Sequence, residues 1–381
     1  MNSEIKAAEN SGTNTEVNYK KRSPLAAALL TLLVPGLGHF YCGEVKRGFF
    51  VFLSVTFITV LFYAVIKFIP QKSIFVIAIL IELPIGLYFL IESIIIAIKK
   101  NKYKLQFYNS ARYYSAIVMT SIFYVSPVTD IFIPGNFSTP TGSMIYTILP
   151  GDKFFDNDLY YGIKNPFTGK YVVIYNKPEN GEIVKFKYKG LPGQAPAGEK
   201  ILYLKRILAV PGDSLVINNR VINLNGKLYI NNNFYFDENF SYLGKGTSSL
   251  IFPEGSNWNV DNYGPLTVPK SGETVSFDTS NINVWKRIIR DEGNKLEIIK
   301  DRIFINDIEK YSYTFKDNYY FMIGDNWYNS LDSRFTGFVN ENDIESKLTM
   351  IYFSWDRDIP LTEFGKKLRS IRWDRIGKMI E

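Results

Sequence analysis

Residues 201–232 read ILYLKRILAVPGDSLVINNRVINLNGKLYINN, and this stretch decides the fold of the second half of the chain. Short runs rich in β-branched and aromatic residues are separated by gaps of Asn, Gly, Pro and Asp. Alternation with a period of two is typical of half-buried strands, and short polar gaps of this kind are typical of turns. The stretch therefore predicts antiparallel β-sheet, and its later part, LVINNRVINLNGKLYINN (215–232), predicts successive hairpins.

The same pattern continues on both sides of this stretch. Further short runs are YVVIY (171–175), EIVKFKY (182–188) and RIFIND (302–307). Heptads, repeats of 20–50 residues and a Gly-rich phosphate loop are absent from the sequence. We predict that residues 134–381 form a mainly antiparallel β domain. The basic end of the chain, FGKKLRSIRWDRIGKMIE (364–381), is compatible with a terminal helix near the membrane or with a solvated end.

The N-terminal part of the chain has a different, apolar composition. A helix needs about 20 apolar residues to cross a bilayer. Segments 48–66 and 73–98 meet this requirement, with a kink expected at Pro84, and segment 113–133 is expected to be a third span that anchors the β domain. Segment 24–41 is shorter and interrupted by Pro and Gly at 35–38. We expect it to be a re-entrant hairpin in an α-helical membrane region.

Basic residues give the orientation of these segments. Cytoplasmic loops are enriched in Lys and Arg, and the 99–112 loop contains four lysines and Arg112. We therefore place this loop, and the polar tail 1–23 that ends in Lys-Lys-Arg, in the cytoplasm. Residues 24–112 then form a membrane module, and residues 134–381 lie on the extracytoplasmic side.

Charge and rare residues exclude several functions. The net charge of +7 is spread along the chain and flanks apolar segments, which favours contact with a lipid bilayer over nucleic acid. The single cysteine, Cys42, permits no intrachain disulfide. The single histidine, His39, lies in the apolar half, which excludes a Ser-His-Asp triad in the β domain and any His-rich metal site. We expect no metal or cofactor.

Three short motifs follow the apolar segments. They are PTGSM (140–144) with LPGD (149–152), YLKR (203–206) with PGD (211–213), and GDNWYNSLDSR (324–334) with Gly337. Each motif alone is typical of a turn or of a solvated strand. Their combination in this order, after membrane spans, is much more specific.

Taken together, these motifs resemble the conserved boxes of type I signal peptidases, the leader peptidases. The resemblance covers most of residues 113–381 and includes NYGP (262–265) with its following Val-Pro and WDRIG (373–377), whereas residues 1–110 carry no such motif. It implies a membrane-bound serine endopeptidase that removes signal peptides from secretory preproteins. It also implies a bacterial cytoplasmic (inner) membrane location and no cofactor.

The resemblance assigns roles to particular residues. It implies that Ser143 is the nucleophile and Lys205 the general base of a Ser-Lys dyad. The Ser143 N–H and the Thr141 hydroxyl would bind the oxyanion. Ser330 would form a hydrogen bond with Lys205 and orient its amine. The expected supporting residues are Asp332 with Arg334, as an ion pair, together with Arg206 and Asp325.

A lysine base is chemically reasonable where histidine is absent. A serine hydroxyl is a weak nucleophile that needs an adjacent base. With an ordinary lysine pKa of about 10.4, only about one amine in 2,500 is neutral at pH 7. Burial disfavours the ammonium form and lowers this pKa. Leu202, Leu204, Ile207 and Met144 are the apolar neighbours expected to contribute to that burial.

The chain departs from the family pattern at four positions. Tyr146 stands where a proline is usual, Asp156 and Asp158 stand where valine and lysine are usual, and Trp327 replaces an arginine. None of these changes removes a catalytic group. We expect Tyr146 and Trp327 to alter the substrate cleft and hence the specificity.

Three other interpretations were weighed. The first is a catalytically inactive scaffold or sensor with the signal peptidase fold. The second is a penicillin-binding type of Ser-x-x-Lys enzyme, but that spacing occurs only at Ser3–Lys6 in the polar tail. The third is a transporter or channel, for which three spans and a hairpin are few and which leaves the outer domain unexplained.

Overall fold

The computed structural model describes residues 19–69, 72–100, 102–132, 141–188, 200–239 and 251–380. Most of the predicted polar tail, with Ser3 and Lys6, and Pro140 of the serine motif lie outside these residues. The chain divides into two compact units, one formed by Met1–Ile69 with Ser73–Ile133 and the other by Pro70–Lys72 with Pro134–Glu381. They are the helical unit and the β unit, and each is described by itself.

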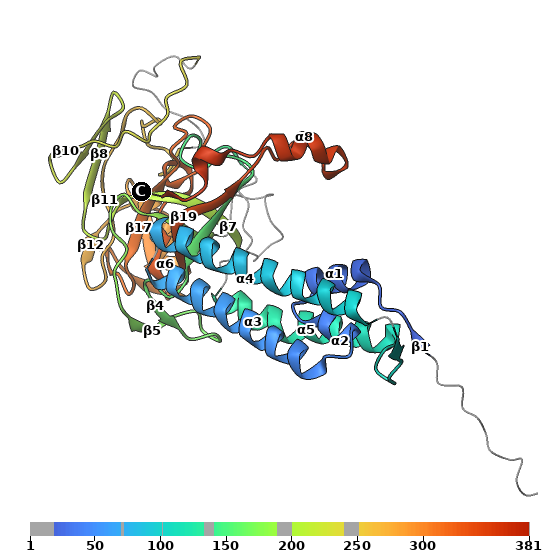
Figure 1. Ribbon diagram of the computed structural model, residues 1–381. Coiled ribbons are helices and arrows are strands. Elements are labelled where there is room, and N and C mark those ends of the chain that lie inside the picture. The colour runs from blue at the N-terminus through green and yellow to red at the C-terminus, as the bar shows by residue number, and fades with distance from the viewer. Residues whose placement is uncertain are drawn as a thin grey trace, which may run out of the picture. The chain divides into compact units, whose positions relative to one another are not determined.

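The helical unit is built from long apolar helices with a short hairpin at one end (Figure 1). A two-stranded sheet, β1 with β2, joins the start of the unit to the loop after α4. Ser23 caps α1 by accepting a hydrogen bond from the Ala26 N–H at 3.3 Å, and Pro24 occupies the first helical turn, where no N–H is needed. The elements are α1 (Pro24–Leu33), α2 (Leu37–Tyr41), α3 (Val45–Phe68), α4 (Lys72–Lys99), α5 (Ala111–Phe132), β1 (Tyr19–Lys20) and β2 (Tyr103–Lys104).

The break between α1 and α2 falls where Pro35 and Gly36 interrupt the apolar segment. Gly36 has a φ of 86°, and a Cβ placed there would lie 2.1 Å from the carbonyl oxygen of Gly48. Only glycine fits both this backbone conformation and this close approach. The hairpin is further fixed by His39, which is buried and places Nε2 3.2 Å from Glu92 Oε2. The re-entrant placement of the hairpin in a membrane stays a prediction.

Two helices in the described part of the chain are long and apolar enough to cross a membrane. They cover Val45–Ile66 and Lys72–Lys99, with mean hydropathies of 2.5 and 2.6. These ranges contain the predicted spans 48–66 and 73–98, and Pro84 lies inside the continuous α4. The predicted anchor, 113–133, coincides with α5 except at its end. Its role as a span stays a prediction.

The β unit is organised around one seven-stranded antiparallel sheet (Figure 1). The strand order is β18-β17-β7-β6-β19-β20, and β3 also pairs with β19. The long strand β19 has three partners, because β6 pairs with residues 344–347, β20 with residues 350–351 and β3 with residues 347–354. The bounds are β3 (Asp152–Asn157), β6 (Ile183–Tyr188), β7 (Ile201–Ala209), β17 (Tyr319–Ile323), β18 (Val339–Asn340), β19 (Ile344–Ser354) and β20 (Lys378–Met379).

Smaller antiparallel sheets surround this sheet. The stretch 214–229 forms two consecutive hairpins, with Leu215 opposite Leu224 and Asn223 opposite Leu228, so this prediction is confirmed. The strands are β8 (Ser214–Asn218), β9 (Val221–Leu224), β10 (Lys227–Tyr229) and β11 (Tyr263–Thr267) in one sheet, and β4 (Gly162–Lys164), β5 (Tyr171–Ile174), β12 (Thr274–Ser276), β13 (Leu296–Ile299), β14 (Arg302–Ile305), β15 (Ile308–Glu309) and β16 (Ser312–Thr314) in three others. The predicted fold class, an α-helical region followed by a mainly antiparallel β domain, is confirmed.

The predicted terminal helix over 364–381 is wrong for most of its length. Helix α8 covers only Phe364–Arg369, and the chain then returns to the sheet as β20. The return has a physical cause, because the Arg375 Nε donates to the buried carboxylate of Asp152 at 3.0 Å and Ile380 is buried. Two other short helices, α6 (Lys286–Asp291) and α7 (Ser333–Thr336), lie in loops of the β unit.

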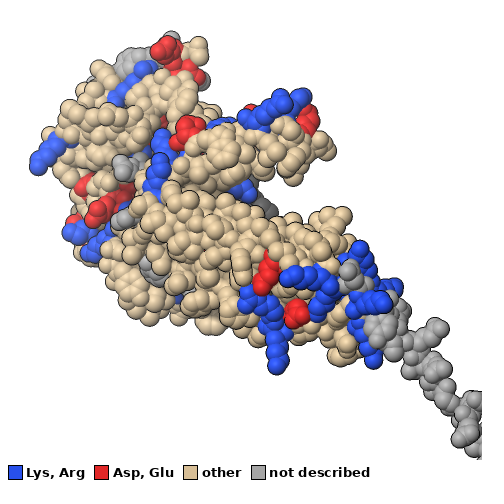
Figure 2. Space-filling model, viewed as in Figure 1, with Lys and Arg blue, Asp and Glu red and all other residues tan. Residues whose placement is uncertain are grey.

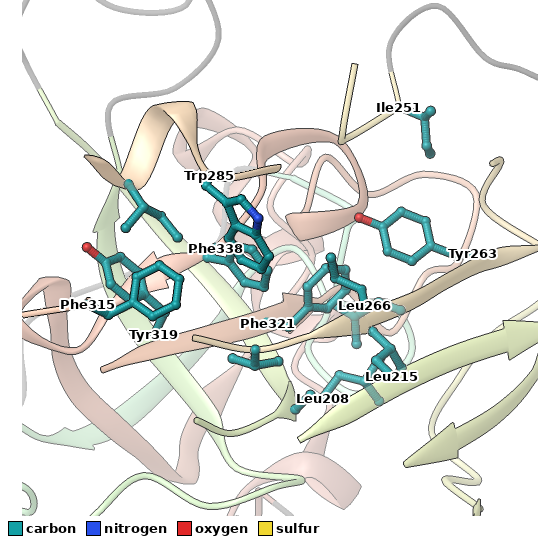
Figure 3. Packing of buried hydrophobic residues seen from close by; sticks show 14 of the residues in the cluster. Leu208, Leu215, Ile251, Tyr263, Leu266, Trp285, Phe315, Tyr319, Phe321 and Phe338 are labelled. Atoms are coloured by element: carbon teal, nitrogen blue, oxygen red, sulfur yellow. The ribbon is translucent and has the colours of Figure 1, made fainter. Parts of the chain in front are cut away.

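The main core of the β unit is rich in aromatic side chains (Figure 3). Phe321 from β17 and Tyr263 from β11 contact each other with ring centroids 5.5 Å apart, and Trp285 stacks on Phe338 at 6.1 Å. Each fully buried side chain of this size contributes roughly 1.5–3 kcal/mol. The packing fixes β17, which leads directly into the third motif, and the adjacent β7, which carries the lysine motif.

Candidate active site

The lysine motif lies on a strand that is buried on both faces. In β7, Lys205 and Arg206 are consecutive, so their side chains point to opposite faces of the sheet. Lys205 is 3% exposed and Arg206 1% exposed. Lys205 lies opposite Val184 of β6, and Arg206 lies opposite Ile323 of β17. Two neighbouring strands therefore hold both cations in place.

The serine motif forms a turn that enters β3, and it brings Ser143 to Lys205. The Lys205 Nζ donates a hydrogen bond to Ser143 Oγ at 2.6 Å across 62 residues of sequence. Ser143 is 8% exposed, and the Thr141 Oγ1 lies 3.4 Å from its hydroxyl. A nucleophile and a base within 2.6–3.2 Å are the geometric requirement for an activated hydroxyl.

The environment of Lys205 favours the neutral amine. Burial, together with the nearby charge of Arg334, lowers the pKa of Lys205 to about 8, although Asp332 and Asp325 act in the opposite direction. No carboxylate in the described part of the chain forms an ion pair with this ammonium. Met144 and Leu204 are buried beside the dyad in an apolar cluster completed by Ile148, Phe154, Ile183, Leu348, Ile351 and Ile380. Leu202, in contrast, is exposed.

Residues of the third motif contact the serine turn and hold it in place. A Cβ on Gly324 would lie 2.1 Å from Ser330 Oγ and 2.6 Å from the carbonyl oxygen of Ser143, so a larger residue there would push the turn away. Asn326 donates from its backbone N–H to the Ser143 carbonyl and from its side chain to the Gly142 carbonyl, both at 3.0 Å. Asn326 was not predicted from the sequence to be a site residue. The signal that could have identified it is its position in the Gly-Asp-Asn motif, two residues after Gly324.

Two buried ion pairs brace this loop. Arg206 donates to both oxygens of Asp325 at 2.8 Å, and Thr147 of the serine turn also donates to Asp325. Arg334 donates to both oxygens of Asp332 at 2.9 and 2.8 Å. Although burial raises the pKa of Asp332, the Arg334 guanidinium holds it below its ordinary value. Bidentate pairs of this kind fix orientation as well as charge.

Ser330 corrects one expectation. Its hydroxyl is buried but makes no hydrogen bond to Lys205. The reason is its position, because Ser330 packs against the Cα of Gly324. Among the described contacts, the Lys205 amine is therefore oriented by its hydrogen bond to Ser143.

Trp327 corrects a second expectation. It was expected to alter the substrate cleft, but it is fully buried in the aromatic core. Its Nε1 donates to Asp261 Oδ1 at 2.9 Å, and the Arg334 guanidinium lies 4.5 Å over its ring. Asp261 directly precedes the NYGP motif, so this partner was also missed in the sequence. Trp327 is a core residue that fixes the third motif.

Tyr146 and Asp156 also depart from the family pattern, and the structure shows their surroundings. Tyr146 is 59% exposed and contacts Tyr235 edge to face at 4.6 Å, so it is available to a substrate. Asp156 is buried, where it pairs with Lys185 and accepts a hydrogen bond from Ser346 at 2.6 Å. Its charge is thus compensated inside the sheet. The described residues contain no cluster of His, Cys, Asp and Glu arranged to hold a metal ion.

Comparison with known proteins agrees with this arrangement. The family model described as "Signal peptidase, peptidase S26" matches residues 110–249 and 308–355, which contain all three motifs. A signal peptidase I from Buchnera aphidicola subsp. Baizongia pistaciae is 30% identical over 260 residues, which cover 65% of this chain and 77% of that protein. The enzyme from subsp. Schizaphis graminum is 30% identical over 248 residues, covering 62% and 73%.

A crystal structure of a signal peptidase I from Enterococcus faecalis aligns with 46% of this chain and 98% of its own, at 18% identity and a TM-score of 0.25. That similarity is too low to bear on the fold. The sequence relatives are sufficient, and the chain belongs to the signal peptidase I family. It is therefore a member of a protease family. It also carries two helices that are long and apolar enough to cross a membrane.

Proposed function

We propose that the protein is a membrane-bound serine endopeptidase that removes N-terminal signal peptides, with Ser143 as the nucleophile and Lys205 as the general base. The observation that carries the proposal is the hydrogen bond of 2.6 Å between the two side chains in a buried pocket. The β unit has no histidine that could act as the base.

In the proposed mechanism Lys205 first accepts a proton from Ser143 and then donates a proton to the leaving amine. With a pKa of about 8, roughly one Lys205 amine in ten is neutral at pH 7, far more than for an ordinary lysine. The neutral amine accepts the proton of Ser143 Oγ while the oxygen attacks the scissile carbonyl. The resulting ammonium then protonates the leaving amine. Lys205 next activates a water molecule, which releases the acyl-enzyme.

The substrate would be held by the main chain and by small apolar contacts. We infer that the Ser143 N–H and the Thr141 hydroxyl stabilise the oxyanion, since Thr141 Oγ1 already lies within 3.4 Å of Ser143 Oγ. The segment before the cleavage site would bind in an extended form along a sheet edge. We infer that shallow apolar contacts near the dyad accept the small residues of an Ala-x-Ala cleavage site.

The helical unit would place this chemistry at a membrane. We propose that α3, α4 and α5 span the bacterial cytoplasmic membrane, that the basic loop between α4 and α5 is cytoplasmic, and that the β unit is extracytoplasmic. The two apolar helices support a membrane location, and the cluster of lysines after α4 supports the orientation.

The test is cleavage of a model preprotein by the full-length protein purified in detergent. We expect cleavage after a small residue by the wild type and by the control Ser280→Ala, which changes an exposed serine of the β unit. Ser143→Ala should cleave at least about 10³-fold more slowly. Wild-type rates in Ser143→Ala would refute the proposal. A folded wild type that cuts no signal peptide would instead favour the inactive scaffold.

A further inference from the structure

Basic residues are concentrated at one end of the helical unit. The elements that meet there are β1, the start of α3, the end of α4, β2 and the start of α5. They carry ten Lys and Arg residues but only two carboxylates, Glu44 and Glu92, a surplus larger than the +7 of the whole chain. Figure 2 shows these side chains as a blue area near α1, α2 and β1. The ten residues are Lys20, Lys21, Arg22, Lys46, Arg47, Lys99, Lys100, Lys102, Lys104 and Arg112.

Both carboxylates at this end are already paired. Arg47 donates to Glu92 at 3.1 and 3.2 Å, and Glu92 also contacts His39. Lys100 pairs with Glu44 at 2.7 Å. Seven further cations are exposed and form no ion pair in the described part of the chain, namely Lys20, Lys21, Lys46, Lys99, Lys102, Lys104 and Arg112. The described residues therefore do not neutralise the positive charge at this end.

Arg22 lies at the centre of this basic end and is buried. It is 5% exposed, and its Nε and Nη2 have no hydrogen-bond partner among the described residues. Its guanidinium lies 4.5 Å from the ring centroid of Tyr41 and 4.3 Å from that of Tyr103. Cation–π contacts stabilise such a charge in part, but they supply no acceptor for its N–H groups. A buried guanidinium without a carboxylate points to an anion from outside the protein.

We propose that this end of the helical unit is a binding site for the phosphate group of an anionic phospholipid, with Arg22 as its central residue. A guanidinium matches two oxygens of a phosphodiester, and this pairing is favoured over a lysine contact. The exposed lysines around it add attraction to an anionic bilayer surface. The two tyrosine rings hold the guanidinium in place before the lipid binds.

A lipid is favoured over a free phosphate by what surrounds the site. The site borders the ends of α3 and α4, whose apolar lengths would lie in hydrocarbon, so a headgroup is present there at high local concentration. Helix α1, which begins two residues after Arg22, also exposes Leu25, Leu29 and Leu32, which suits acyl chains. The proposal does not depend on the peptidase chemistry or on which side of the membrane this end faces.

The experiment is native mass spectrometry of the full-length protein in detergent, titrated with phosphatidylglycerol or with phosphatidylcholine of the same acyl chains. We expect the wild type to bind phosphatidylglycerol at least about tenfold more tightly. In Arg22→Gln this preference should fall about tenfold, as expected for the loss of charge-assisted hydrogen bonds. Arg302→Gln, an exposed arginine of β14 in the β unit, is the matched control and should bind like the wild type.

Several outcomes would overturn the proposal. They are equal binding of the two lipids by the wild type, an unchanged preference in Arg22→Gln, or complete competition by millimolar glycerol phosphate, which would assign a free anion site. If Arg22→Gln does not fold, Arg22→Lys keeps the charge without the planar fork and should lose at least about threefold. Wild-type binding by that variant would equally refute the role of the guanidinium. Preprotein cleavage by the same samples reports separately on the dyad.

Discussion

Lys205 in the β unit and Arg22 in the helical unit are both buried cations that form no ion pair with a described residue, but their chemistry differs. Lys205 is 3% exposed and Arg22 is 5% exposed. A buried ammonium can lose its proton, and burial indeed lowers the pKa of Lys205 to about 8. A guanidinium cannot be deprotonated in a protein. Burial therefore makes the neutral form of Lys205 more accessible, whereas Arg22 keeps its charge.

Arg206 and Arg334 show a third solution to the same physical problem. Each is fully buried, and each forms a bidentate pair with a buried aspartate, Asp325 or Asp332. These pairs fix the loop of the third motif, and their charges are compensated inside the protein. The four cations together show that the partner of a buried charge, rather than burial alone, decides whether it serves chemistry, binding or structure.

The test with the largest expected effect replaces Lys205 by an arginine, which keeps its charge permanently as Arg22 does. Lys205→Arg retains the charge but removes the ability to become neutral, so the residue cannot accept the Ser143 proton. We expect preprotein cleavage to fall at least about 10³-fold. The measurement is kcat/KM, with Lys270→Arg on the exposed surface of the β unit as the control. Substantial activity in Lys205→Arg would mean that the positive charge, and not the neutral amine, is what Lys205 supplies.

A second test removes one partner of a paired cation. Arg334→Met leaves Asp332 buried and unpaired, and we expect the free energy of unfolding of the β unit to fall by about 3–5 kcal/mol. Chemical denaturation followed by tryptophan fluorescence measures this change. Arg302→Met, in an exposed pair, should change stability by less than about 1 kcal/mol. Similar small losses for both variants would show that the buried pair contributes no more than a surface pair.

A third test concerns the stability cost of burying Lys205. Its folded pKa is lowered from 10.5 to about 8, so the folded protein binds the proton less well than the unfolded chain. The penalty is fully present below about pH 8 and disappears as the pH rises through 10.5. Lys205→Met should therefore raise the free energy of unfolding at pH 7 by as much as about 3 kcal/mol. A gain that persists at pH 11 would argue against titration of Lys205 as the cause.

A fourth test is the pH dependence of cleavage by the wild type, which changes by only about tenfold for each pH unit. Because only the neutral amine acts as the base, kcat/KM should rise about tenfold per pH unit below pH 8 and level off above it. A stopped assay with one preprotein between pH 5.5 and 9.5 measures this profile. A profile that is flat below pH 8 would place the controlling titration on another group and would break the contrast with Arg22.

Most helices and strands could be predicted from the sequence because the patterns that indicate them lie within short segments. Alternating residues predicted the hairpins at 214–229, and apolar length predicted α3 and α4. The three motifs led to the dyad through a family resemblance. The helix prediction was wrong after residue 369 because the partners of this segment, β19 and Asp152, are distant in sequence. Trp327 and Ser330 were misjudged because the direction of a loop side chain depends on packing.

The sequence by itself determined the succession of apolar helices and antiparallel strands, the single histidine and the order of the serine, lysine and Gly-Asp-Asn motifs. These follow from composition, periodicity and motif spacing along the chain. Only the tertiary structure decided that Ser143 and Lys205 meet at 2.6 Å, that Gly324 must lack a side chain, and that Arg22 is buried without a carboxylate. Each of these depends on which distant segments exclude water from one another, and that is a property of packing in three dimensions.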